Sequence, residues 1–409
     1  MKETTSKTYS LKEKFASLGP GILIVGSFIG PGTVTSATRA GANYGFALLW
    51  CIIFSVVAVS VLQEMAARLG VVKQAGLCEV MLGEVTGNNA LRWALILIVA
   101  VPIVLGGFAY MGGDLTGTAL GLSAITGVST KIIAPVWGIC IMLITTFAGN
   151  ALKQLEKLLG ICVTIMAVVF VVTMIIVKPD LGELFSGLVP TVPDGAMLTC
   201  VSLIGTTVVP YNLFLHAASS SRTWHNTDEL PLVRFGTIVP MIMGGIVTGA
   251  VLITSSTVMR GMTINNAMDM AVQLEPTLGS FAQPFMAIGL IAAGVSSAVC
   301  TPLGVSYVLA GLFGWKTDRS DKRYAITNYV VLIFGILIAA SGFNPIAIIM
   351  AAQAVNGVFL PVSVGVVVWL TSRSSVMGKY KNSILSTVLG VGVFIISLII
   401  GVNSVISLF

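Results

Sequence analysis

The chain has 409 residues, of which 56% are hydrophobic and only 9% are charged, and its formal net charge is +6. Soluble domains carry about 25% charged residues, so this composition excludes a soluble globular protein and indicates an integral membrane protein. The six cysteines form no CxxC pair, which argues against a metal cluster or a disulfide framework.

Residues 1–18 are polar and lack the apolar core of a cleavable signal peptide, so we expect a cytoplasmic tail there. The rest of the chain consists largely of apolar segments of about 20 residues, the length that crosses a bilayer. We expect eleven spans, near residues 19–42, 44–67, 93–120, 131–150, 156–177, 196–221, 235–258, 280–312, 325–341, 345–370 and 384–408.

The basic residues agree with this order of spans. If the N-terminus is cytoplasmic, eighteen of the 22 lysines and arginines fall in inner segments, and only Arg39, Lys131, Lys178 and Arg260 fall outside. We therefore expect a multi-pass protein of the plasma (cytoplasmic) membrane with an extracellular C-terminus. The net positive charge reflects topology in the lipid bilayer and indicates no nucleic-acid partner, since no basic run is interleaved with aromatic residues.

Two of the predicted spans are interrupted near their centres. The first contains "SFIGPGTVTSA" (27–37) and the sixth contains "SLIGTTVVPYNLFLHAAS" (202–219). Pro31 and Pro210 each remove a backbone donor, and glycine tolerates the unwound backbone beside Pro31. Such backbone is stable in a membrane only where protein or a watery cavity surrounds it. We predict helices broken at Gly30–Thr33 and Thr206–Tyr211.

The two interruptions occupy matching places in the chain. Spans one and six are five spans apart, an odd number, so the two halves that they begin have opposite orientations. The sequence therefore predicts an all-α membrane protein with a first five-helix repeat over 19–177, an inverted second repeat over 196–370 and an additional C-terminal span at 384–409. Paired interruptions in inverted repeats are typical of the central site of a transporter.

The residues around these breaks resemble a known family. "LGPGILIVGSFIGPGTVTSATRAGANYGFALLW" and "LQEMAARLGVV" are similar to the opening of the Nramp (natural resistance-associated macrophage protein) family of proton-coupled divalent-metal transporters. "LIGTTVVPYNLFLHAA" resembles the sixth helix of that family, and "GGDLTGTA", "GLIAAGVSSAV" and "AAQAVNGVFLPVS" resemble its third, eighth and tenth. The resemblance, from about residue 18 to 370, implies the fold shared with the amino-acid symporters and transport by alternating access.

The chain departs from the family at the positions that bind metal. The family's Asp-Pro-Gly-Asn is here Gly30–Thr33, and its Met-Pro-His is here Val209–Tyr211. The resemblance implies that the ion-binding carboxylate, amide and thioether are absent, and that a glutamate of the third helix is matched by Gly117. It also implies that the carbonyl-donating position falls at Thr206 and that the tenth-helix glutamine is retained as Gln353.

We predict a substrate site from the residues at the two breaks and in the tenth span, with helix breaks at Pro31, Gly32 and Pro210 and no secure metal-ligand set. The site residues are Gly30, Thr33, Thr206, Val209, Tyr211, Asn212, Gln353 and Asn356. Their side chains offer neutral oxygens and amides, which are compatible with three classes of substrate. The first is a divalent ion, above all Mg²⁺ with much of its water shell, because Mg²⁺ dehydrates reluctantly. The second is a neutral or zwitterionic organic solute, and the third is an anion held by half-helix N-termini.

Two ionisable residues are candidates for a proton route. Asp114 is an acid within a span, where ionisable groups are costly and usually functional, and it matches an acidic position of the family. His216 follows the second break and matches a family histidine. A structural hydrogen bond explains Asp114 equally well, and a buried core histidine explains His216. Without the first-helix acid, we expect transport that is weakly or not coupled to protons.

Other classes of function fit less well. With two histidines and one clear acid within a span, no catalytic centre can be assembled, so we expect no enzyme and no cofactor. A channel would need a continuous polar stripe, whereas the polar residues gather at the breaks. A receptor-like membrane protein that transports nothing remains an alternative. The expected partners are a small ion or small-molecule substrate and the lipid bilayer, with a monomer as the simplest assembly.

Overall fold

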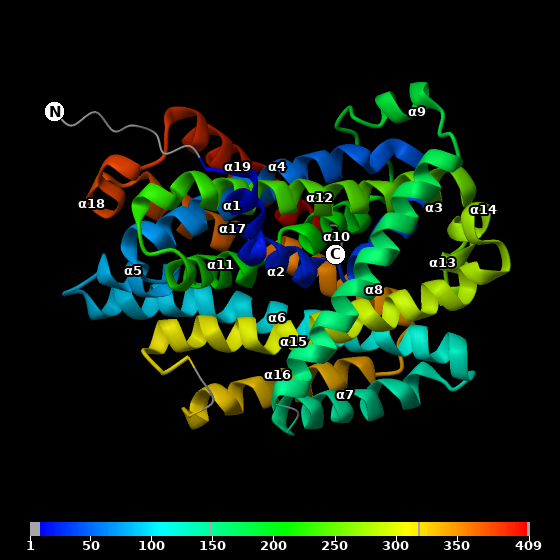
Figure 1. The fold of residues 1–409 in the computed structure, drawn as a ribbon, viewed down its shortest axis with the longest axis horizontal. Coiled ribbons are helices and arrows are strands. Elements are labelled where there is room, and N and C mark those ends of the chain that lie inside the picture. Colours follow the sequence, from blue (N-terminus) through cyan, green and yellow to red (C-terminus); the bar gives the residue numbers. More distant parts are fainter. Residues whose placement is uncertain (1–8, 148, 318–319, 407–409) are drawn as a thin grey trace.

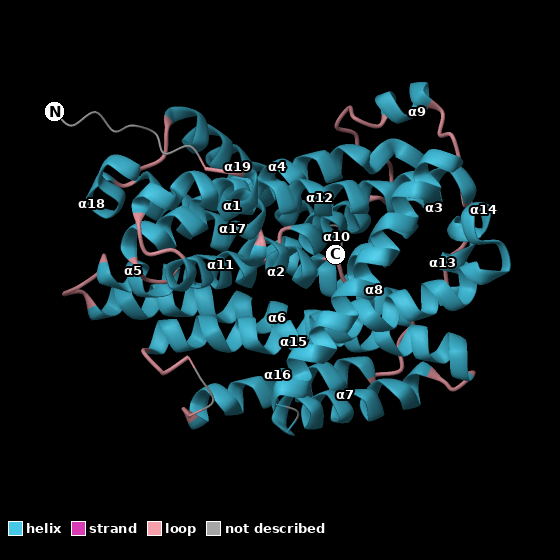
Figure 2. Cartoon of the chain, viewed as in Figure 1, coloured by secondary structure: helices cyan, strands magenta, loops and turns pink. Residues whose placement is uncertain are grey.

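The computed structural model describes residues 9–147, 149–317 and 320–406, so parts of the predicted tail (1–8) and of the last span (407–409) lie outside it. Within these ranges the chain forms helices and loops and no strand (Figure 2). Ten helical segments of the described chain are long and apolar enough to cross a membrane. The prediction of an all-helical membrane protein is therefore confirmed.

The first predicted span is two helices. A short helix, α1 (Leu11–Ala16), precedes them, and the span itself consists of α2 (Gly19–Phe28) and α3 (Pro31–Tyr44). Only the 3-10 turn η1 (Gly45–Leu48), with Gly45 at φ 57°, separates α3 from α4 (Leu49–Lys73). The segment Pro31–Lys73 is therefore nearly continuous helix, which is why two predicted spans form one of the ten.

The remaining long helices of the first half follow in the predicted order, together with two short helices that were not predicted. They are α5 (Leu77–Gly83), α6 (Asn89–Thr126), α7 (Thr130–Phe147), α8 (Gly149–Ile176) and the short α9 (Leu181–Ser186). The helix α6 is longer than the predicted span because Asn88 caps it, accepting a hydrogen bond from the Leu91 backbone at 3.0 Å.

The second half repeats the pattern, beginning with a span divided into α10 (Met197–Thr207) and α11 (Pro210–Thr223). The later helices are α12 (Leu230–Val258), α13 (Ala267–Ala271), α14 (Glu275–Leu278), α15 (Ala282–Phe313), α16 (Lys322–Ala339), α17 (Pro345–Ser372), α18 (Ser374–Met377) and α19 (Ile384–Ile406). Short 3-10 turns lie at Thr227–Glu229, Val272–Leu274, Gly279–Phe281 and Gly378–Tyr380.

Close helix crossings surround the broken helices. In Figure 1, α2, α10 and α11 lie in the middle of the molecule, and α6 runs beside α15. The crossing of α6 and α15 is close because Gly294 has no side chain, and an added Cβ would lie 3.0 Å from the Asp114 carbonyl oxygen. Small residues let helices approach in this way inside membranes, where the hydrophobic effect between helices is weak. The crossing brings polar residues of α15 next to Asp114.

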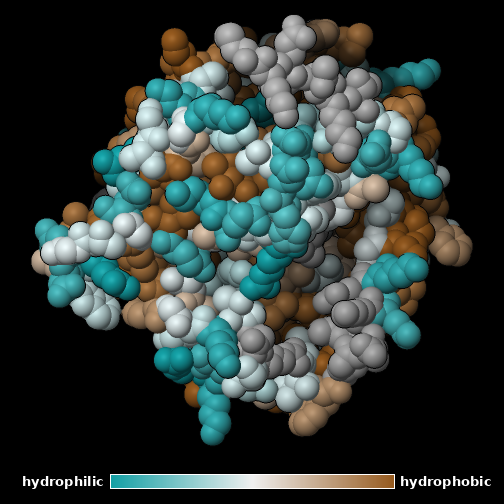
Figure 3. Space-filling view, turned by 60° about the vertical axis from the view of Figure 1, so that its left-hand side comes forward, coloured by the Kyte–Doolittle hydropathy of each residue, from teal (hydrophilic) through white to brown (hydrophobic). Residues whose placement is uncertain are grey.

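The outer surface matches a lipid environment. Large apolar side chains are exposed along α7, α8 and α19, among them Ile132, Val168 and Val388. Hydrophilic side chains gather at the end of the molecule that carries α5 and α18 (Figure 3). The predicted cytoplasmic orientation of this end stays a prediction, because the orientation depends on the placement of the basic residues alone.

Candidate functional site

The two breaks have the same local geometry. The helix α2 ends at Phe28 with Ile29 as its C-cap, and Gly30 is the extended N-cap of α3. The helix α10 ends at Thr207 with Val208 as its C-cap, and Val209 is the extended N-cap of α11. In each case proline is the first residue of the second helix, where its missing N–H costs nothing. The predicted breaks are confirmed, and the unwound stretches are shorter than predicted.

Thr33 and Thr206 join the two breaks. Their hydroxyl oxygens are 2.8 Å apart, and both side chains are buried. Thr33 also donates to the Phe28 carbonyl at the end of α2. Because a hydroxyl donates one proton, Thr206 is the donor in the hydroxyl pair. One hydrogen-bonded chain therefore links the end of α2 to the last turn of α10.

Gln353 of α17 lies against the first turn of α3. An added Cβ at Gly32 would overlap its amide group, so Gly32 allows the close approach. Both polar atoms of the Gln353 amide, Nε2 and Oε1, are buried and have no hydrogen-bond partner. Buried polar atoms usually have partners, so the Gln353 amide has unused hydrogen-bonding capacity at the first break.

Asp114 of α6 faces the first break. Its carboxylate accepts hydrogen bonds at Oδ2 from Ser297 Oγ at 2.8 Å and from Thr301 Oγ1 at 3.1 Å, both on α15. Its other oxygen, Oδ1, would lie 3.6 Å from a Cβ added at Gly30. The acid is only 1% exposed. The structure thus brings Asp114, predicted as part of a proton route, to the break itself.

Two tyrosines connect Asp114 to the second break. The Tyr211 hydroxyl is 3.1 Å from Thr301 Oγ1, and Thr301 in turn donates to Asp114. The Tyr110 ring packs edge-on against the Tyr211 ring, with centroids 6.1 Å apart. The Tyr110 hydroxyl interacts with the side chains of Ser297 and Thr206. Hydroxyl groups therefore surround the space between the two breaks.

The other predicted residues take no part in the hydrogen bonds described so far. Val209 and Asn212 are buried at the start of α11, and Val209 contributes no polar side chain. Asn356 lies a turn beyond Gln353, where an added Cβ at Gly106 would be 2.6 Å from its Oδ1. Its Nδ2 is buried without a partner. His216 is also buried, but its Nδ1 is 2.9 Å from Gln63 Oε1 on α4, so it faces a different neighbour from Asp114.

Gly117, which the resemblance matches to a glutamate of the third helix, has no room for a side chain. It packs on the ring of Pro31, and an added Cβ would overlap the proline side chain. Any larger residue at this position would push α6 away from the first break. The absence of a side chain at Gly117 therefore fits the closeness of α6 and α3.

Sequence reasoning missed Tyr110, Ser297 and Thr301. Ser297 and Thr301 are one turn apart on α15, so they lie on the same face of that helix. Many hydroxyl residues occur in the apolar helices of this chain, and their spacing alone does not separate a site residue from one that bonds to its own helix. Only the crossing of α15 with α6 identifies these two.

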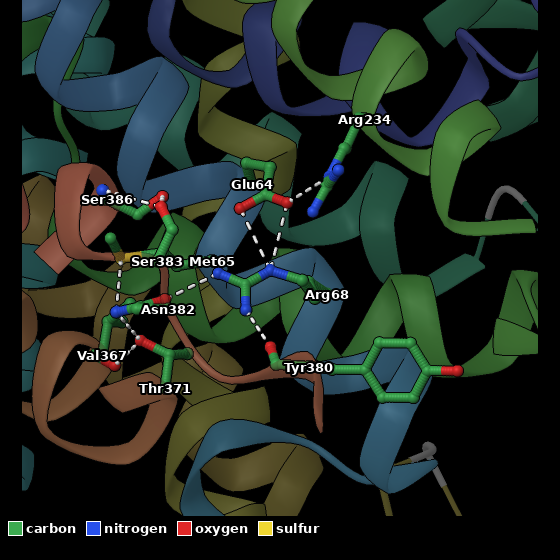
Figure 4. Close-up of polar contacts among 10 residues, drawn as sticks. All are labelled: Glu64, Met65, Arg68, Arg234, Val367, Thr371, Tyr380, Asn382, Ser383 and Ser386. Carbon is green, nitrogen blue, oxygen red and sulfur yellow. Dashed lines mark hydrogen bonds and ion pairs between the residues drawn. The ribbon is translucent and has the colours of Figure 1, made fainter. Parts of the chain in front are cut away.

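A second polar cluster lies at the end of α4 (Figure 4). Glu64 pairs with Arg68 at 3.1 Å and also with Arg234 of α12 at 2.9 Å. The buried Arg68 guanidinium further donates to the Tyr380 carbonyl and, at 2.7 Å, to Asn382 Oδ1. This cluster ties α4 and α12 to the segment between α17 and α19 and is separate from the helix breaks.

The central site differs from an ordinary metal cage. In the parts of the chain that the structure describes, no three histidine, cysteine, aspartate or glutamate side chains come together. Thr33, Thr206 and Gln353 are each at most 1% exposed, so the conformation is closed to solvent on both sides of the site. A buried polar centre at two broken helices is the arrangement found in secondary membrane transporters.

Comparison with known proteins gives the family. The family model described as natural resistance-associated macrophage protein-like (Nramp) matches residues 21–407, so the chain belongs to the Nramp family. A divalent metal cation transporter MntH from Klebsiella pneumoniae subsp. pneumoniae is 27% identical over 412 residues, covering 98% of this chain and 96% of that protein. The MntH of Deinococcus radiodurans is 25% identical over 395 residues, covering 93% of this chain and 88% of that one.

Solved structures show the same fold. The Eremococcus coleocola manganese transporter, in complex with an aromatic bis-isothiourea substituted compound, superposes with a TM-score of 0.78 at 20% identity, covering 99% of this chain and 89% of that chain. MhsT in complex with L-phenylalanine superposes with a TM-score of 0.62 at 15% identity, covering 96% of this chain and 98% of that chain. The predicted likeness to an amino-acid-symporter fold with two broken helices is confirmed.

Proposed function

We propose that this chain is a secondary transporter that moves divalent metal ions across the plasma membrane by alternating access. The observation that carries the proposal is the closed polar centre between the breaks, where Thr33 meets Thr206 and the Gln353 amide has no partner. The MntH relatives are divalent metal cation transporters by name, which supports this class of substrate. Repeats over 19–177 and 196–370, acting as a monomer, would supply the two sides of the site.

The proposed ion is Mg²⁺ with part of its water shell, in preference to Mn²⁺ or Fe²⁺. The side chains at the breaks offer hydroxyl and amide oxygens, whereas transition metals favour imidazole or sulfur. Val209 and Tyr211 stand where sulfur and imidazole would stand in the family pattern that the sequence resembles. Neutral oxygens suit hydrated Mg²⁺, because the ion can keep several of its waters.

We further propose that uptake is weakly or not coupled to protons. Coupling requires that proton and substrate affect the same conformational equilibrium. His216 Nδ1 is 2.9 Å from Gln63 on α4, a partner outside the breaks, so we expect its proton to have little influence on a bound ion. Asp114 lies at the break, where Ser297 donates to its carboxylate, and a carboxylate that stays ionised with and without the ion carries no proton across the membrane.

An organic solute is the second candidate. Neither Gly30 nor Val209, the N-caps at the two breaks, is capped by a side-chain hydrogen bond, and such N-termini suit a carboxylate or another anion. The Asp114 carboxylate beside Gly30 opposes a free anion but not a zwitterion or a neutral molecule.

Purified protein in liposomes tests these candidates together. We expect Mg²⁺ influx above that of protein-free vesicles, and no influx of amino acids or sugars. Influx of an organic solute without divalent-ion influx would replace the proposed substrate. Binding without influx of any solute would indicate a receptor-like protein.

A further inference from the structure

The carboxylate that a cation needs in this site comes from α6. Moving a divalent ion into an apolar helix bundle is very costly unless a negative charge lies close to it. Among the residues described at the two breaks, Asp114 is the one that carries a carboxyl group.

The hydrogen bonds around Asp114 fix the direction of its carboxylate. Ser297 donates to Oδ2 at 2.8 Å, and Thr301 Oγ1 lies 3.1 Å from the same oxygen and 3.0 Å from the Ser297 carbonyl oxygen, which competes for its one proton. These contacts at one oxygen orient the carboxyl plane and leave Oδ1 on the side of Gly30. A carboxylate has about four acceptor positions, so Oδ1 can bind a cation while Oδ2 keeps these contacts.

A space the size of one added carbon atom lies beside Gly30, on the side that Oδ1 faces. The Gly30 backbone is extended, with φ −110° and ψ −175°, a conformation that any residue adopts. An added Cβ would make ordinary contacts, 3.6 Å from Asp114 Oδ1 and 3.5 Å from Ser297 Oγ. Neither backbone nor packing therefore demands glycine at this position, in contrast to Gly32, where Gln353 fills the space.

A chain of polar groups joins this space to the rest of the site. Tyr110 interacts with Ser297 and with Thr206, and Thr206 bonds Thr33 across the breaks. The unpaired Gln353 amide lies against Gly32, two residues from Gly30. Charge, amide and hydroxyl oxygens thus meet around the first break.

We propose that Asp114 is the charged ligand of the transported divalent cation and binds it through Oδ1 in the space beside Gly30. This inference rests on the proposed function and assigns the ion's counter-charge within the same site. The Asp114 carboxylate on α6 thus supplies the negative charge that an acidic side chain at position 30 would supply.

The test measures the affinity of the full chain for Mg²⁺ and for Mn²⁺ by isothermal titration calorimetry. Ion influx into proteoliposomes is measured in parallel. Asp114→Asn keeps the shape of the side chain and removes the charge. We expect it to weaken Mg²⁺ binding by about 30-fold or more, since loss of a buried charge partner costs at least about 2 kcal/mol. Asp194→Asn, the same change at an exposed loop residue, is the matched control and should bind as the wild type does.

A second variant restores the negative charge by placing a carboxylate at position 30, opposite Asp114. Gly30→Asp in the Asp114→Asn background should recover binding to within about 10-fold of the wild type. Gly30→Asp alone should bind Mg²⁺ more tightly than the wild type, because two carboxylates then face one ion. This single variant also tests the proposal if Asp114→Asn does not fold as a monodisperse protein.

The outcomes distinguish a failure of the proposed function from a failure of the inference about Asp114. Wild-type protein that neither binds nor admits a divalent ion would overturn the proposed function and this inference with it. Wild-type binding that survives in a folded Asp114→Asn would overturn the inference alone. Unchanged affinity in Gly30→Asp would contradict the assigned position of the ion.

Discussion

Thr33 and Thr206 lie on different halves of the chain, yet their hydroxyl oxygens are 2.8 Å apart where the two broken helices meet. In the closed conformation this bond joins the first turn of α3 to the last turn of α10. The two residues are also candidate ligands, so the same hydroxyls that close the site can open toward an ion. The bond is therefore expected to exchange with ion binding.

Replacing either threonine tests this exchange. Thr33→Val and Thr206→Val keep the volume and remove the hydroxyl, so we expect ion influx to fall by about 10-fold, equivalent to roughly 1.4 kcal/mol of lost oxygen contact. The matched control is Thr248→Val on α12, because the Thr248 hydroxyl bonds only to its own helix at Gly244, at 3.0 Å. Equal influx in all three variants would show that the hydroxyl pair has no part in transport.

The glycine contacts between α6 and α3 give a prediction for stability. At Gly117 an added Cβ overlaps Pro31, whereas at Gly160 on α8 nothing lies within 4 Å. Gly117→Ala should lower the free energy of unfolding by about 1–3 kcal/mol through overpacking. Gly160→Ala should leave it unchanged or raise it by up to about 1 kcal/mol through helix propensity. Thermal unfolding in detergent measures both, and equal melting temperatures would contradict the packing at Gly117.

Glu64 gives a prediction for the second polar cluster. It lies between Arg68 and Arg234, and the Arg68 side chain is only 4% exposed. Glu64→Gln should destabilise the protein by about 2–3 kcal/mol, because Arg68 would remain buried without its counter-charge. Glu183→Gln is the comparison, since its pair with Arg260 is exposed and should contribute less than about 1 kcal/mol. Similar melting temperatures for the two variants would refute the difference.

Proton coupling is tested with a pH-sensitive dye enclosed in the vesicles. During Mg²⁺ influx we expect little or no acidification of the interior, and the same influx in His216→Ala as in the wild type. The reason is that the recorded partner of His216 Nδ1 is Gln63 on α4, which lies outside the two breaks. Stoichiometric acidification that disappears in His216→Ala would instead make His216 and Gln63 part of a proton route.

The sequence predicted the architecture well because its strongest signals are local. Pro31 and Pro210 lack a backbone N–H, so each one marks a break in its span. Each is also the first residue of the helix that follows the break. The basic residues ordered the spans. The number of spans was less certain at the junction of α3 and α4. There only a short turn at Gly45 separates the two helices, so they can be counted as one span or as two.

The composition of the site was less predictable. Gln353, Thr33 and Thr206 were expected together, and the structure brings them to the breaks. The hydroxyls that hold Asp114 come from Ser297 and Thr301, and their role depends on the crossing of two long helices. No periodicity within one helix specifies which face of another helix it meets.

A divalent-ion site without the ligands that select transition metals should discriminate poorly among divalent ions, and competition for influx measures this discrimination. Mn²⁺ influx into proteoliposomes should be weak, and Mg²⁺ and Ca²⁺ should inhibit it at similar concentrations. Gly30→Asp with Thr33→Asn and Val209→Met should then create tight Mn²⁺ binding that Ca²⁺ no longer displaces, because carboxylate, amide and thioether would be present together. Wild-type protein that binds Mn²⁺ at micromolar concentration and excludes Ca²⁺ would show that the site selects transition metals after all.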